Sequence, residues 1–314
     1  MVRRRPLLQA LVTLSAAAAC ATPTGPLPNA QQLLVAAENY VAADRWNAAL
    51  EQLWQIDGEL CPKRLRDRRD LALARAEMGR GQPWRAFLAL EKFSDLYPHS
   101  DLRTQAVELL WRIGTTLVES DGGFLFFWSD RRAGRTVLEH LVTRHPDTQR
   151  LADALRILGD MAFDDGDYEL AQTRFRDIIL ERPESEWKFY AQFRFAMSIV
   201  ASLQGPDYDL DRMEHAVREL RGFLANDPSN PQMVAETQRA LALLLDWQVR
   251  RHLDIAEFYR TVGSAEGERH HLELATRDEF ADVPAYRRAL DARDRFLQRA
   301  PDDRQLAAPG GGQP

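Results

Sequence analysis

The chain has 314 residues, and 45% of them are hydrophobic, which is enough apolar surface for a full core. Acidic residues outnumber basic residues by 47 to 41, giving a net charge of −6 at pH 7, which argues against nucleic acid as the main partner. The chain has two cysteines, and Cys20 is predicted below to carry a lipid. Cys61 then has no cysteine partner, which excludes a disulfide framework and a cysteine zinc site.

Residues 1–19 have the pattern of a signal peptide. The positive segment Arg3-Arg4-Arg5 precedes an uncharged apolar stretch from Leu7 to Ala19. This stretch is too short to stay in a bilayer as a helix, which takes roughly 20 apolar residues. It fits the apolar region of a signal peptide, so we expect export from the cytoplasm.

Cys20 follows a run of small residues and is the predicted lipidation site of the mature chain. Residues 20–29 then form a flexible tether, because prolines at 23, 26 and 28 favour an extended chain. Two alternatives stay open: cleavage after Ala19 would release a soluble periplasmic protein, and a cytoplasmic protein could carry a misleading start. At the other end, residues 301–314 are glycine-rich and aperiodic, which predicts a disordered tail.

Residues 152–183 contain the clearest copy of a repeated helical pattern. Apolar residues recur three or four positions apart, as in amphipathic helices, and a period of about 34 residues is typical of tetratricopeptide repeats. The small residues Gly159 and Ala171 allow two helices to approach, and the bulky Leu155 and Phe175 fill the space between hairpins. Gly166-Asp167 forms the turn, and Pro183 ends the second helix.

The same spacing recurs along most of the chain, with insertions at two turns. The further copies cover residues 33–62, 73–98, 106–146 and 191–228, and a weaker stretch covers 240–280. A single hairpin cannot bury both faces of its helices, whereas stacked hairpins can. We therefore predict an all-α tetratricopeptide-repeat solenoid of about five to six helical hairpins over residues 30–300, with a concave groove suited to binding proteins.

An aromatic insertion from Gly122 to Trp128 interrupts a turn that needs only a few residues. Its bulky side chains include Phe124, Phe127 and Trp128, and such an apolar run is costly when it is exposed. The insertion either folds back over the solenoid as core or contacts a protein partner or lipid.

Several stretches are similar to the BamD family of outer-membrane assembly lipoproteins. They are Phe193 to Ser198, the loop Gly205 to Asp209, Ala216 to Pro228, and Ala256 to Tyr259 followed by Gly263 and His271-Leu272. The resemblance covers roughly residues 30–285. Its more specific parts are the Gly-Pro-Asp-Tyr-Asp loop and the helix with Phe258-Tyr259, whereas the rest is generic repeat.

The resemblance implies a non-catalytic, lipid-anchored scaffold on the periplasmic face of the outer membrane. In that family the N-terminal repeats are associated with unfolded β-barrel clients, and the C-terminal repeats dock the barrel insertase, which acts with accessory subunits. The candidate partner-binding residues are Asp207, Tyr208, Arg250, Arg251, Phe258 and Tyr259, together with the aromatic insertion. The alternative is another periplasmic repeat adaptor, serving cell-wall synthesis or a Tol-type envelope complex.

Catalytic and metal-binding patterns are missing from the sequence. It contains no G-x-S-x-G, Walker A, G-x-G-x-x-G or H-E-x-x-H motif. His270 and His271 are adjacent, so on a helix they point about 100° apart and are expected to be surface or packing residues. The acidic run Asp207 to Asp211 opens like a calcium loop but lacks its glycine and glutamate, so we read it as a helix-capping turn. We expect no enzyme activity, cofactor or metal.

Overall fold

The computed structural model describes residues 29–56, 61–120, 130–207, 209–226 and 228–306. Within these ranges all regular structure is helical, as predicted. The signal peptide, Cys20, Tyr208 and the aromatic residues Phe124, Phe127 and Trp128 lie outside the described residues.

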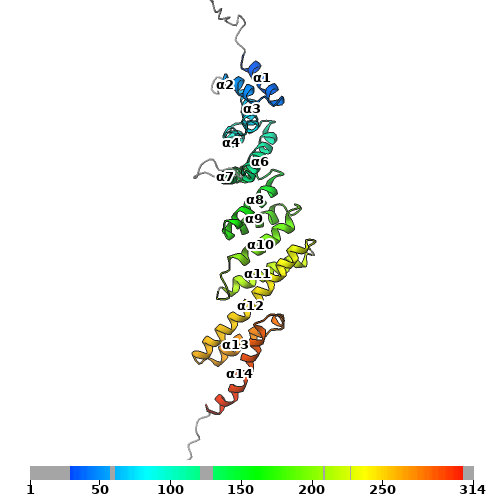
Figure 1. Ribbon diagram of the computed structural model, residues 1–314. Helices are drawn as coiled ribbons and strands as arrows, with labels where there is room; N and C mark the ends of the chain where they lie inside the picture. Colours follow the sequence, from blue (N-terminus) through cyan, green and yellow to red (C-terminus); the bar gives the residue numbers. More distant parts are fainter. Residues whose placement is uncertain (1–28, 57–60, 121–129, 208, 227, 307–314) are drawn as a thin grey trace, which may run out of the picture.

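Six helical hairpins follow one another along the described part of the chain and form one elongated stack (Figure 1). The paired helices are α1 (Ala30–Ala42) with α2 (Trp46–Trp54), α3 (Arg66–Gly79) with α4 (Pro83–Leu90), α6 (Arg103–Glu119) with α7 (Asp130–Arg144), α8 (Leu151–Asp164) with α9 (Tyr168–Glu181), α10 (Lys188–Ser202) with α11 (Leu210–Ala225), and α12 (Pro231–Thr261) with α13 (Ala265–Ala275). Short connecting elements are the 3₁₀ helix η1 (Lys63–Leu65), α5 (Phe93–Leu96) and η2 (Asp278–Phe280), and α14 (Tyr286–Leu306) completes the stack. The predicted all-α tetratricopeptide-repeat solenoid is confirmed.

The α8–α9 hairpin shows why the sequence pattern needs its small residues. A Cβ atom added to Gly159 would lie 2.8 Å from the ring of Phe175, which is fully buried. The two helices reverse through Gly166, whose φ of +80° is in the region that glycine adopts without strain. Asp167 then caps α9 by accepting a hydrogen bond of 3.1 Å from the backbone N–H of Leu170.

Two large apolar cores meet at α10. One core runs through hairpins α3–α4 to α8–α9 and ends at Ala191, and the other begins at Ala196 and extends to Ala289. Phe195 is partly buried and packs against both cores. Smaller clusters hold α1 and α2 against α3 and surround the buried, free Cys61, whose burial raises the pKa of its thiol. Each core is shared by neighbouring hairpins, as stacking requires.

The C-terminal third differs from the prediction in two boundaries. The weak repeat from residue 240 onward begins within one continuous helix of 31 residues, α12, which Asn230 caps at its N-terminus. Helix α14 runs to Leu306, so the first six residues of the stretch predicted as a tail, 301–306, are helical. The helix-breaking glycines start only at Gly310, and Pro301 does not end the helix. None of the helices in the described ranges has the length and apolar character to cross a membrane.

Candidate protein-binding surfaces

A ladder of polar pairs joins the first helices of successive hairpins. The Arg68 guanidinium donates to Glu38 at 3.0 Å, and the Arg75 guanidinium donates to the Gln105 amide oxygen at 2.6 Å. Further along the stack Arg150 donates to Glu108 at 2.9 Å, and the Trp187 indole N–H donates to Asp153 at 2.7 Å. Each pair connects one hairpin to the next, alongside the apolar cores that neighbouring hairpins share.

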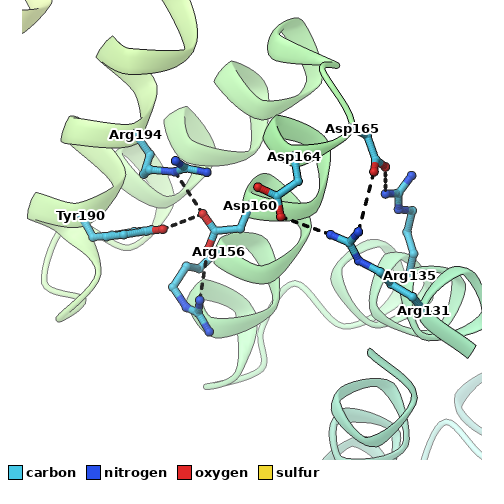
Figure 2. Close-up of polar contacts among 8 residues, drawn as sticks. All are labelled: Arg131, Arg135, Arg156, Asp160, Asp164, Asp165, Tyr190 and Arg194. Carbon is cyan, nitrogen blue, oxygen red and sulfur yellow. Dashed lines mark hydrogen bonds and ion pairs between the residues drawn. The ribbon is translucent and has the colours of Figure 1, made fainter. Parts of the chain in front are cut away.

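Asp160 on α8 receives the densest set of contacts (Figure 2). The Tyr190 hydroxyl donates to Asp160 at 2.6 Å, and the Arg156 guanidinium donates to it at 3.1 Å. Arg194 Nε lies 3.1 Å from the same carboxylate and forms an ion pair with it. Its N–H does not point at the carboxylate oxygen, so the contact is not a hydrogen bond. Burial, reinforced by the Asp160 hydrogen bond, raises the pKa of Tyr190. These contacts join α8 to α10, and they engage the Asp160 carboxylate within the protein.

Arg194 is also held by aromatic rings. Its guanidinium carbon lies 3.9 Å from the centre of the Phe163 ring and 5.7 Å from that of Phe175. On the opposite side of the α8–α9 turn, Arg131 and Arg135 of α7 pair with the turn carboxylates Asp164 and Asp165 (Figure 2). The C-terminal half of α8 is therefore tied to α10 through Asp160 and to α7 through Asp164 and Asp165.

The C-terminal hairpin presents an apolar surface that the rest of the described chain leaves uncovered. Phe258 is 60% exposed, and Val262, the residue that follows the end of α12, is 58% exposed. Tyr259 instead packs inward: its ring stacks on His271 with 5.6 Å between centroids, and a Cβ on Gly267 would collide with it. Of the two predicted aromatic anchors on this hairpin, Phe258 is largely exposed beside the Tyr259 ring, and Tyr259 supports the hairpin.

The predicted charged anchors also have separate surroundings. Arg250 pairs at 2.7 Å with Asp246, whose carboxylate also accepts the backbone N–H of Ala285 at 2.8 Å. Arg251 is half-buried and forms no ion pair within the described ranges, and Asp207 is exposed in the α10–α11 loop. No hydrogen bond or ion pair between described residues joins Asp207 to α12. Asp209 performs the predicted capping, accepting from the Asp211 backbone N–H at 2.9 Å.

A buried histidine pair, which sequence reasoning missed, lies between α12 and α13. His252 is 8% exposed, and its Nδ1 is 3.2 Å from Nδ1 of His271. A hydrogen bond between these atoms needs one N–H and one lone pair, so at least one ring must be neutral. Burial, helped by the charge on His271, lowers the pKa of His252 to about 4. Among the described residues no group of three or more metal-binding side chains gathers here or elsewhere.

Comparison with known proteins adds little beyond the fold. No protein-family model matches the chain, and no curated protein matches it. A solved structure similar to it is the crystal structure of the tetratricopeptide-repeat domain of P58(IPK), with 17% identity and a TM-score of 0.29. The alignment covers 86% of this chain and 66% of that one. The chain is a tetratricopeptide-repeat-like helical protein. This assignment rests on the stacked hairpins described above, and the fold is typical of non-catalytic scaffolds for protein–protein interaction.

Proposed function

We propose that this protein is a lipid-anchored scaffold on the periplasmic face of the outer membrane. In this proposal it resembles BamD and assists insertion of β-barrel proteins by binding the insertase, its accessory subunits and unfolded clients. The observation that carries the proposal is the exposed apolar surface of Phe258 and Val262 on the C-terminal hairpin. The sequence resemblance gives this hairpin the docking role, and exposed aromatic side chains are frequent interface anchors.

Replacing the predicted lipid attachment site should release the protein from the membrane. We expect Cys20→Ser to move the protein from the outer-membrane fraction to the soluble fraction, because the serine hydroxyl cannot take the thioether-linked lipid. Circular dichroism of the released protein should retain the helical signal of the native chain. Cys61→Ser is the matched control, because Cys61 is buried within the first repeats. This substitution should leave the fractionation of the protein unchanged. A Cys20→Ser protein that still sediments with outer membranes would contradict lipid anchoring.

Removing the exposed aromatic anchor should weaken recovery of the barrel insertase. We expect Phe258→Ser to reduce the affinity for the insertase about 30-fold, which corresponds to an anchor of about 2 kcal/mol. The measurement is quantitative co-purification from solubilised membranes, with the melting temperature recorded in parallel. Leu180→Ser on α9 is the control, because Leu180 is 69% exposed and lies outside the C-terminal hairpin. Recovery of cell-wall synthesis or Tol-type proteins in place of the insertase would favour the other kind of envelope adaptor.

A further inference from the structure

Four rings meet where the last part of α12 packs on α13. His252 and Tyr259 lie on α12, and His270 and His271 lie on α13. The centre of the His271 ring is 5.4 Å from that of His252, 5.6 Å from that of Tyr259 and 5.2 Å from that of His270. We call these four residues the histidine cluster. The ring of His271 is therefore the centre of this contact between the two helices.

The histidine cluster is built for neutral rings. His252 and His271 face each other through Nδ1 atoms 3.2 Å apart, and one of these atoms must supply a lone pair to the hydrogen bond. A proton on both rings removes that lone pair and places two cations side by side. Double protonation therefore replaces an attraction between α12 and α13 with a repulsion.

The surroundings of the histidine cluster oppose added positive charge. Burial is the largest cause that lowers the pKa of His252, and the charged groups that act on it, His271, Arg277 and His270, lower it further. The pKa of His271 is lowered as well, by burial and then by His270. The two rings therefore bind protons more readily once the helices have separated.

The apolar core at the histidine cluster is small. It consists of Ala256, Leu272 and Phe296, whereas the first part of α12 belongs to the large core shared with α10 and α11. The buried carboxylate of α13, Glu268, pairs with Arg299 of α14 at 2.5 Å, so it holds α13 to α14. Regions with few buried apolar contacts open before the rest of a protein does. The contact between α12 and α13 is thus weakly supported at the place where the charge would enter.

We propose that the histidine cluster is a proton-sensitive switch that separates α13 from the last part of α12 in mildly acidic solution. At neutral pH the neutral rings hold the two helices together. At lower pH His252 and His271 bind protons in the separated form and retain it, while the hairpins from α1 to α11 stay folded. Separation also ends the stacking of Tyr259 on His271, beside the exposed Phe258. Its effect on docking rests on the proposed function, whereas the separation itself does not.

Hydrogen exchange followed by mass spectrometry tests the switch on the full chain in non-ionic detergent. Exchange is compared at pH 7 and pH 5, with exchange times scaled to the intrinsic rates. The pKa of His252, lowered from 6.5 to about 4, should by itself raise the fraction of separated molecules about 20-fold between these two pH values. We therefore expect the protection of the α13 amides to fall about 20-fold or more. The amides of α3, far along the stack from α13, should keep their protection (Figure 1).

Substitution of the paired histidines then assigns the effect. His252→Gln/His271→Gln should abolish the pH-dependent loss of protection in α13. The matched control is His145→Gln, which removes a buried histidine outside this hairpin and should leave the loss in α13 unchanged. If the double variant already lacks protection in α13 at pH 7, His271→Gln replaces it and should reduce the loss.

Three results would overturn the proposal. The first is equal protection of the native α13 amides at pH 7 and pH 5. The second is a loss of the same size in α3, which would show unfolding of the whole stack. The third is an undiminished pH dependence in the substituted proteins.

Discussion

Gly159→Leu should destabilise the central hairpins by about 1–3 kcal/mol or more, since overpacking a close helix contact forces the backbones apart. The position has no room for a side chain, because even a single added carbon would lie 2.8 Å from Phe175. Phe175 belongs to the core that spans residues 71–191, so its displacement disturbs neighbouring hairpins as well. Urea unfolding followed by circular dichroism measures the effect.

Gly222 supplies the matched control for Gly159. It is a helical glycine on α11, and a Cβ built at this position would have no neighbouring atom within 4 Å. Gly222→Ala should therefore stabilise the protein by about 0.5–1 kcal/mol, because alanine loses less backbone entropy in a helix. Equal unfolding midpoints for Gly159→Leu and the native protein would mean that α8 and α9 are not in close contact.

Acidification from pH 7 to pH 4 should lower the free energy of unfolding by several kcal/mol through two buried histidines. Burial, with contributions from His140 and Arg103, lowers the pKa of His145 to about 4, and His252 is lowered to about 4 by burial and by His271, Arg277 and His270. Their ordinary value is 6.5, so between pH 6.5 and 4 the unfolded chain binds protons that the folded chain excludes. The free energy of unfolding is therefore highest above pH 6.5. Between pH 6.5 and 4 it falls by about 3 kcal/mol for each of the two histidines.

Variants that cannot titrate isolate these contributions. His252→Gln should make the pH dependence of urea unfolding shallower between pH 6.5 and 4, and the addition of His145→Gln should make it shallower again. His99→Gln, a substitution at an exposed histidine, controls for the loss of a histidine as such. If the native and doubly substituted proteins show parallel pH profiles, the two histidines are not buried as neutral rings.

The repeat pattern predicted most of the fold because it consists of local signals. Gly159, Ala171 and Phe175 lie within one hairpin, so their spacing alone reveals the contact that the structure confirms. The continuity of α12 had a signal as well, since no glycine or proline occurs between Pro231 and Thr261. The first part of α12 packs against α11 and its last part against α13, so no single apolar stripe runs along the whole helix. For that reason the sequence pattern read as separate stretches.

The surfaces were much less predictable than the fold. The pairs Glu38–Arg68 and Glu108–Arg150 join charges that are 30 and 42 residues apart, and their meeting depends on how each hairpin is rotated on the next. In a chain with 28% charged residues, the sequence offers many pairings of similar spacing. The His252–His271 contact was missed for a similar reason, because it crosses between two helices whereas the sequence drew attention to the adjacent His270.

Because α12 is one unbroken helix, it connects the last two hairpins of the C-terminal third rigidly. With 31 residues it is about 46 Å long. Leu244 and Val249 seat its first part in the core shared with α10 and α11, and Ala256 seats its last part against α13 and α14. No loop interrupts the helix between Phe258 and the part of α12 that packs on α11. A partner that binds the exposed end of α12 therefore contacts the same continuous helix that packs in the core with α10 and α11.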